Sequence, residues 1–169
     1  MEPGSDSFTL TTRWSTAADA EGLAVVHAGA WRYAYAGVIP EPGLTRMIGR
    51  RGPGWWRRLH DGRARALVAV FGGDIVGYAL FGRCRSGPGG EIQELYVRPE
   101  CHGNGFGSRL FAAARAELDS RGAVPLTVWC LAGNLVGLDF YRALGGRETG
   151  RAREHVAGAV LEKLRFTWT

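Results

Sequence analysis

The stretch EIQELYVRPECHGNGFGSRLFAAARAELDSRG, residues 91–122, determines how the rest of the chain is arranged. Residues 91–97 favour a short strand, and Pro99 ends it because proline cannot donate to a sheet ladder. A glycine loop follows, and then apolar residues recur at helical spacing, with Ser108 as the expected N-cap and Gly122 at the expected helix end. The stretch therefore predicts a strand, a glycine loop and a helix in succession.

Three glycines at alternate positions, Gly103, Gly105 and Gly107, form the loop. Glycine lets the backbone come close to a ligand, and the free amides of a first helical turn favour an anion. We interpret the loop as a phosphate site, with a purely geometric tight turn as the alternative. A Rossmann site is disfavoured because the next expected strand, residues 126–130, ends without an acidic residue. The P-loop pattern G-x-x-x-x-G-K-[ST] is absent from the sequence.

Length and composition indicate one ordinary globular domain. The chain has 169 residues, of which 46% are hydrophobic, and we expect residues 8–169 to form a single domain behind a flexible leader, residues 1–7. No apolar run reaches the roughly 18 residues of a membrane span, and the polar N-terminus does not resemble a secretory signal. These features predict a cytoplasmic protein without membrane association.

The charge and the cysteines restrict the function further. The net charge is +5, but the basic residues are spread along the chain without a nucleic-acid-binding motif, so nucleic-acid binding is the less favoured alternative. The three cysteines, Cys84, Cys101 and Cys130, are odd in number and far apart. They predict neither a disulfide framework nor a metal site.

The order of expected elements predicts a mixed α/β fold. Its central sheet has about seven mostly antiparallel strands flanked by helices, with one parallel pair around the strand–helix–strand unit, joined by a right-handed crossover. The expected strands are 8–13, 66–71, 75–82, 91–97, 126–130, 147–149 and 160–169. The expected helices begin near 16–19, 44, 55, 108 and 134.

Residues 91–107 resemble the acetyl-CoA loop of the GNAT (general N-acetyltransferase) superfamily, as found in small bacterial acetyltransferases. That signature is [Q/R]-x-x-G-x-[G/A] after a strand often written E-[LI]-x-x-L-Y-V-x-P, and His102 stands here where Gln or Arg is usual. The resemblance implies that backbone groups of Leu95 and Val97 pair with the pantetheine arm, beside a bulge in the strand. It also implies that the pyrophosphate lies on the loop residues His102, Gly103, Asn104, Gly105, Phe106, Gly107 and Ser108.

Residues 134–145 carry a second resemblance, to the pattern N-x-x-A-x-x-F-Y-x-x-x-G of the same superfamily, with Gly137 in place of Ala. It implies that Asn134 helps to hold the cofactor arm and that Tyr141 lies near the CoA sulfur. Aminolysis of a thioester expels a thiolate, and a phenol of pKa about 10 can donate a hydrogen bond or proton to it. A core aromatic whose hydroxyl reaches water is the alternative for Tyr141.

The acceptor amine must lose a proton before it attacks, and a carboxylate is the usual base. Glu91 is the first candidate, since several superfamily members carry their base there, and Glu94 is the second. Period two groups Glu91 with Leu95 and Val97, and Glu94 with Ile92 and Tyr96. Solvated edge glutamates are the alternative for both.

The segment Trp31–Pro40 resembles a W-x-x-A-Y-x-G-[LIV]-[LI]-P stretch of small bacterial members, which implies that Trp31 and Tyr35 are walls of the acceptor pocket. An aromatic core under a loop is the alternative. The sequence thus predicts an N-acetyltransferase that moves acetyl from acetyl-CoA to a primary amine in a ternary complex, without a metal. A CoA-binding sensor or partner module without catalysis remains the main alternative. The superfamily often forms homodimers, and the sequence leaves the acceptor and the acyl chain length open.

Overall fold

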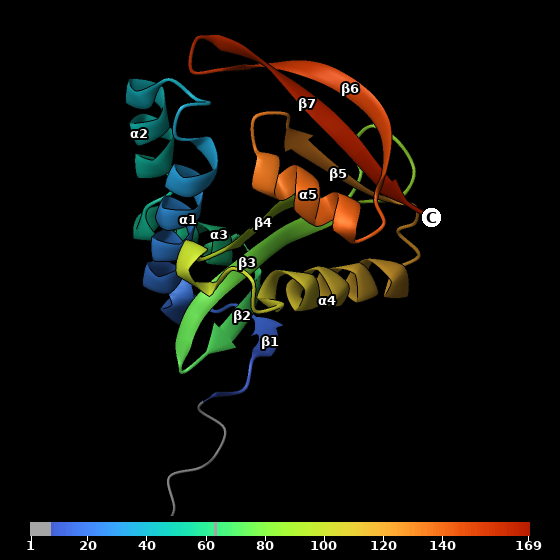
Figure 1. The fold of residues 1–169 in the computed structure, drawn as a ribbon. Helices are drawn as coiled ribbons and strands as arrows, with labels where there is room; N and C mark the ends of the chain where they lie inside the picture. Colours follow the sequence, from blue (N-terminus) through green and yellow to red (C-terminus); the bar gives the residue numbers. More distant parts are fainter. Residues whose placement is uncertain (1–7, 63) are drawn as a thin grey trace, which may run out of the picture.

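The computed structural model describes residues 8–62 and 64–169, so the predicted leader, residues 1–7, lies outside the described residues. One seven-stranded sheet has the order β1-β2-β3-β4-β5-β7-β6, and β4 and β5 are its parallel pair. The predicted fold class is confirmed (Figure 1). The strands are β1 (Thr11–Trp14), β2 (Leu67–Phe71), β3 (Asp74–Arg83), β4 (Gly90–Val97), β5 (Leu126–Leu131), β6 (Arg147–Val156) and β7 (Ala159–Trp168).

Helices cover both faces of the sheet. One face packs against α4 and α5 in a core around Ile92, Phe111 and Phe166, and the other packs against α1 and α3 around Trp56 and Tyr78. The helices are α1 (Ala20–Tyr35), α2 (Glu41–Gly49), α3 (Pro53–Asp61), α4 (Phe106–Ser120) and α5 (Leu135–Ala143), with short 3₁₀ turns η2 (Ala17–Asp19) and η3 (Pro99–Cys101).

A β-bulge in β4 overturns the predicted faces of the two glutamates. Glu94 lies opposite Leu80 of β3, but Ile92 lies opposite the next residue, Phe81, so that Gln93 is an extra residue in the ladder. An extra residue shifts the alternation of side chains by one. Glu91 and Glu94 therefore share one face, and grouping Glu94 with Ile92 was wrong.

The grouping of Glu91 with Leu95 and Val97 was wrong for the same reason. Leu95 packs with Ile92 in the core under α4, whereas both glutamates line a cavity on the opposite face. A single inserted residue thus brings two carboxylates together.

Strands β4 and β5 separate soon after they pair. Their ladder joins residues 90–92 to residues 126–128 and goes no further. The strands diverge beyond it, which opens the sheet between Leu95 and Cys130. The gap is the place where a ligand can enter the sheet.

Helix α4 begins earlier than predicted. Its N-cap is Gly105, in the left-handed region at φ 75°, and Ser108 lies in the first turn. A residue without Cβ adopts this conformation at little cost. The loop therefore turns sharply into the helix, and its first amides point out of the helix end.

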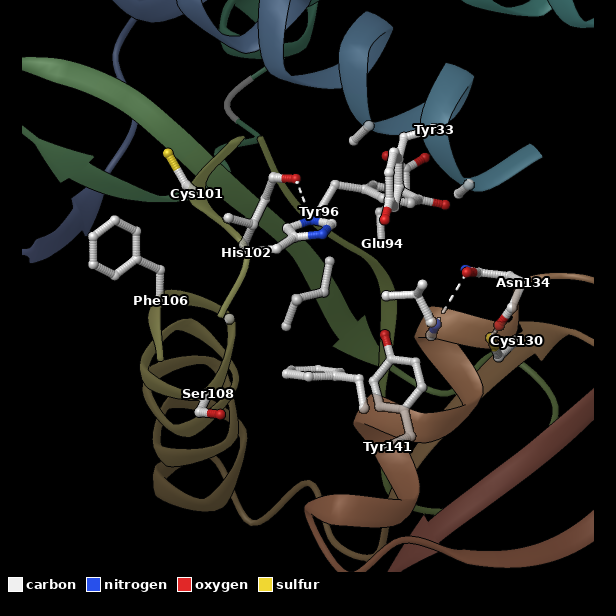
Figure 2. Close-up of a pocket in the computed structure, with 18 of the residues that line it drawn as sticks. Tyr33, Glu94, Tyr96, Cys101, His102, Phe106, Ser108, Cys130, Asn134 and Tyr141 are labelled. Atoms are coloured by element: carbon white, nitrogen blue, oxygen red, sulfur yellow. Dashed lines mark hydrogen bonds between the residues drawn. The ribbon is translucent and has the colours of Figure 1, made fainter. Parts of the chain in front are cut away.

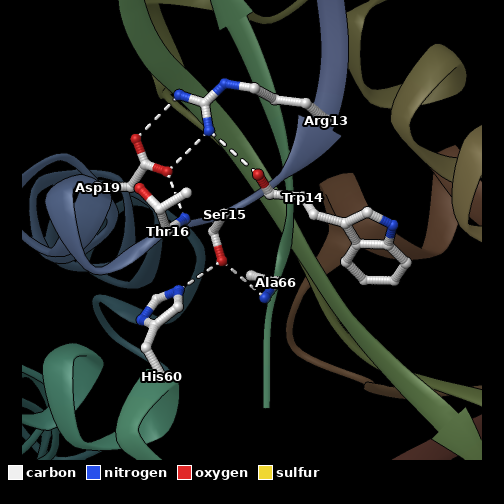
Figure 3. Close-up of polar contacts among 7 residues, drawn as sticks. All are labelled: Arg13, Trp14, Ser15, Thr16, Asp19, His60 and Ala66. Atoms are coloured by element: carbon white, nitrogen blue, oxygen red, sulfur yellow. Dashed lines mark hydrogen bonds and ion pairs between the residues drawn. The ribbon is translucent and has the colours of Figure 1, made fainter. Parts of the chain in front are cut away.

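Asp19 fixes the junction between β1 and α1 (Figure 3). Its carboxylate accepts hydrogen bonds from Arg13 at 2.8 and 2.9 Å and from the Thr16 amide at 2.8 Å. Nearby, Ser15 Oγ accepts from the Ala66 amide at 2.9 Å and lies 2.7 Å from His60 Nε2. The hydrogen bonds from Arg13 lower the pKa of Asp19.

We expect Asp19→Asn to lower the free energy of unfolding at pH 7 by about 1 kcal/mol. The folded pKa lies below the unfolded one, so the stabilisation is present above the unfolded value of 3.8 and is lost as the pH falls through the folded pKa. The difference from the wild type should therefore shrink at pH 3 in urea denaturation curves. The exposed hairpin variant Asp74→Asn is the control, and a difference that persists at pH 3 would contradict this assignment.

Candidate active site

A cavity of about 370 Å³ fills the gap between β4 and β5 and reaches the N-terminus of α4 (Figure 2). All predicted cofactor residues except Asn104 line it. The Asn104 side-chain amide instead donates to the Cys101 carbonyl at 3.3 Å. The predicted residues that line the cavity are Leu95, Val97, His102, Gly103, Gly105, Phe106, Gly107, Ser108, Asn134 and Tyr141.

The start of α4 supplies backbone amides to this cavity. The first amides of a helix have no acceptor within the helix, and Gly103 and Gly105 take positive φ angles of 81° and 75° that favour glycine. Gly107 serves packing instead, since a Cβ there would lie 3.1 Å from the Phe140 ring of α5, which would have to shift. No lysine or arginine lines the cavity within residues 8–62 and 64–169, so its attraction for an anion comes from these amides and the helix dipole.

His102 supports the end of β4. Its Nε2 lies 3.1 Å from the Val97 carbonyl oxygen, to which it donates, and its ring meets Tyr33 edge to face at 5.3 Å between centroids. This histidine therefore holds the strand end in place, and only Nδ1 is left to offer to a ligand.

Tyr141 of α5 is buried among Phe111, Phe140 and Phe166. Its hydroxyl points into the cavity in Figure 2 and has no hydrogen-bond partner among the described residues. Burial raises the pKa of this phenol above its ordinary value. The hydroxyl therefore keeps its proton and can donate a hydrogen bond to a ligand atom.

Asn134 is the N-cap of α5, and its Oδ1 accepts from the Gly137 amide at 3.0 Å. The side-chain NH₂ of Asn134 lies within reach of the Tyr35 hydroxyl, and Asn134 lines the cavity, so this group can donate to a ligand there. A Cβ at Gly137 would lie 2.6 Å from that nitrogen and 2.9 Å from Cys130 Sγ. Glycine at this position therefore leaves room for both side chains.

Cys130 lines the cavity but is a poor nucleophile. Burial raises the pKa of its thiol to about 12, and the thiolate is the reactive form. Burial also raises the pKa of Cys101 beside the loop. Neither cysteine is poised to form a covalent intermediate.

A second cavity of about 270 Å³ adjoins the first on the face of α1 and α2. The two cavities share one wall, which consists of Tyr35, Gln93, Glu94, Tyr96, Trp129 and Cys130. The predicted acceptor-pocket residues Trp31 and Tyr35 both line the second cavity. Its remaining lining residues are Ile39, Met47, Glu91, Leu131, Glu154, Val156 and Lys163.

The two candidate bases in the second cavity, Glu91 and Glu94, have different surroundings. Arg51 binds Glu94 at 2.7 and 3.2 Å, and the Tyr78 hydroxyl donates to it at 2.8 Å. Tyr78 in turn accepts from His27 Nδ1 at 2.9 Å. Glu91 has no ion pair or hydrogen bond in the described part of the chain. Glu94 is thus held by its neighbours, while Glu91 is free to meet a ligand.

His27 contributes a pH dependence to stability. Burial lowers its pKa from 6.5 to about 3, so the stabilisation is present above pH 6.5 and is lost as the pH falls from 6.5 towards 3. From this group we expect the free energy of unfolding to fall by about 2 kcal/mol between pH 7 and pH 5. His27→Gln, which keeps a donor for Tyr78, should lose that part of the dependence in urea titrations at the two pH values. Equal losses in both proteins would rule His27 out as the source.

The part of the chain that the structure describes shows neither a metal-binding cluster nor a membrane-spanning helix. It contains no cluster of three or more histidine, cysteine, aspartate or glutamate residues that could hold a metal ion. None of its helices is long and apolar enough to cross a membrane.

Comparison with known proteins gives consistent results. The acetyltransferase (GNAT) family model matches residues 30–145. YuaI of Bacillus subtilis, an uncharacterised N-acetyltransferase, is 27% identical over 94% of this chain and 92% of its own length. The PaiA N-acetyltransferase of Thermoplasma acidophilum, solved with coenzyme A, has a TM-score of 0.75 at 18% identity, covering 95% of this chain and all of its own. YncA of Salmonella typhimurium, solved with acetyl-CoA, has a TM-score of 0.68 at 20% identity, covering 94% and 92%.

Proposed function

The chain belongs to the GNAT family of acetyltransferases, and from this premise we propose that it moves acetyl from acetyl-CoA to a primary amine by direct attack in a ternary complex. The observation that carries the proposal is the pair of cavities that meet at one wall. The first offers helix-end amides and a protonated phenol. The second offers aromatic walls and a free carboxylate. A thioester and an amine can therefore meet without leaving the protein.

The residues of the first cavity suit a CoA arm. The amides between Gly103 and Ser108 would hold the pyrophosphate, and the separated edge of β4 at Leu95 and Val97 would pair with the pantetheine. Asn134 would donate from its NH₂ group. Solved relatives with CoA and acetyl-CoA support this use of the fold.

Residues on the two sides of the shared wall carry out different steps of the transfer. A free alkylammonium has a pKa of about 10.4, so the acceptor arrives protonated. Glu91, which has no ion pair among the described residues, accepts that proton directly or through water, and the amine attacks the thioester carbonyl. Tyr141 donates a hydrogen bond to the sulfur as the thiolate leaves. Glu94, held by Arg51, keeps the wall between the cavities in place.

Thermal melting with acetyl-CoA, CoA, NAD and ATP tests the proposal. A ligand that binds only the folded chain stabilises it by about 2.7 kcal/mol at a hundredfold excess over its Kd, and we expect that effect from acetyl-CoA and CoA alone. Thiol release with a panel of amines then tests transfer. Binding without transfer to any amine would favour a CoA sensor, and no shift with either CoA ligand would refute the proposal. A cytoplasmic location and a homodimer stay predictions.

A further inference from the structure

The second cavity, which we call the acceptor cavity because the proposed function places the amine there, contains the one lysine of the chain. Of the 21 lysine and arginine residues in the sequence, Lys163 alone is lysine. It lies on β7, opposite Leu131 of β5 and Ala152 of β6. Its side chain lines the cavity in which the proposed function places the amine. The single side-chain amine of this protein thus lies where an amine is to be acetylated.

The ammonium of Lys163 lies close to the cofactor cavity. Nζ is 4.9 Å from the centroid of the Trp129 ring, and Trp129 belongs to the wall that both cavities share. Glu154 forms an ion pair with the ammonium at 3.7 Å, and the Lys163 side chain is 26% exposed. One aromatic ring therefore separates this nitrogen from the proposed path of the cofactor.

Lysine has a chemical property here that arginine lacks. Either residue could pair with Glu154 or stack on Trp129, and Arg165 does lie over the same ring at 5.6 Å. A guanidinium stays protonated and is no nucleophile, whereas an ammonium on a flexible four-carbon stem can lose its proton and attack a carbonyl. Glu91, which is free to accept that proton, lines the same cavity.

We propose that Lys163 is an internal acetyl acceptor of this enzyme, an inference that rests on the proposed function. The Lys163 Nζ–carbon bond forms and the thioester carbon–sulfur bond breaks. Of the two protons that the ammonium loses, one passes to Glu91 or water and the other to the CoA thiolate, so the products are acetyl-lysine, CoA thiol and one proton. A tethered group has an effective concentration on the order of millimolar. Lys163 therefore competes with a free amine at low amine concentration.

Acetylation would change the acceptor cavity. Lys163 is the one cationic side chain in the cavity lining that the structure describes, beside Glu91, Glu94 and Glu154. A neutral acetyl-lysine releases Glu154 from its ion pair. The modified cavity is more acidic and should favour cationic acceptors over anionic ones.

Intact-mass spectrometry tests the inference on the full chain with saturating acetyl-CoA and no added amine. We expect one acetyl group, mapped to Lys163 by peptide analysis, at a first-order rate that does not change with protein concentration. Lys163→Arg keeps the charge and should gain none at this position. The urea-unfolded chain with acetyl-CoA gives the rate of uncatalysed acetylation, which the folded chain should exceed at least tenfold.

Three results would overturn the inference: an unmodified Lys163, a rate equal to that of the unfolded chain, or a rate that rises with protein concentration. The amine panel separates this failure from that of the proposed function. If thiol is released with an added amine while Lys163 stays unmodified, only the proposal of an internal acceptor is refuted. If acetyl-CoA binds but neither thiol release nor a modified Lys163 is found, both this proposal and the proposed function are refuted.

Discussion

Tyr141→Phe is expected to lower kcat by about 10²–10³-fold, the usual effect of removing one donor from a developing anion. The hydroxyl points into the cofactor cavity without a partner in the described chain, and burial keeps its pKa above the ordinary value. It is therefore protonated throughout the working range and acts as a donor to the leaving sulfur. Steady-state kinetics with acetyl-CoA and a responsive amine measure the loss, which should be the same at every pH between 6 and 9.

Two controls distinguish this effect on kcat from a general loss of structure: the thermal stability of Tyr141→Phe and the variant Tyr35→Phe. The lost hydroxyl makes no bond within the described residues, so the melting temperature and the shift with CoA should be retained. Tyr35→Phe removes a hydroxyl from the shared wall that is bonded to Tyr96 at 2.7 Å, and its effect on kcat should be clearly smaller. An unchanged kcat in Tyr141→Phe would make this tyrosine a packing residue only.

The glycine loop and the α5 cap were predictable because their signals are local. The three loop glycines, Asn134 and Tyr141 lie within two short stretches, and the structure brings them to one cavity. The start of α4 was misplaced because a serine is the stronger N-cap signal in sequence. Here Gly105 takes a left-handed conformation that only the folded loop reveals.

The placement of the two glutamates could not be predicted in the same way. The resemblance implies a bulge in this strand but not its position. That it falls at Gln93 depends on how β4 pairs with β3, and a strand read alone alternates without interruption. The partners of Glu94 were missed as well, because Arg51 is 43 residues away in sequence and carries no motif. Long-range pairing decides which carboxylate is free.

The acceptor cavity also depends on a strand that was predicted too short. The sequence indicated strand at residues 160–169, which agrees with β7, but only at residues 147–149 for β6, which continues to Val156. The hairpin of β6 and β7 brings Glu154 and Lys163 to the cavity. Charged residues alternate along this hairpin and weaken the apolar signal on which strand prediction depends. These residues also lie beyond the matched family region.

Glu91→Gln is expected to lower kcat/KM by about 10²-fold at pH 7, within the range for loss of a general base. The loss should shrink as the pH rises, because the neutral fraction of an alkylamine grows about tenfold per pH unit below its pKa of about 10.4. Measurements of kcat/KM with one amine from pH 6.5 to 9.5 would show this rescue. Binding of acetyl-CoA should not change.

Glu94→Gln should behave differently, although the bulge places both carboxylates on one face. The Glu94 and Arg51 side chains are only 12% and 26% exposed, so removing the carboxylate charge leaves a guanidinium poorly compensated. We expect the free energy of unfolding to fall by about 1–3 kcal/mol, with no recovery of activity at high pH. If Glu94→Gln showed the pH-dependent rescue and Glu91→Gln kept the wild-type profile, the roles would be exchanged. The amine would then lose its proton at the wall shared with the cofactor, and Arg51 would have to yield its partner in each cycle.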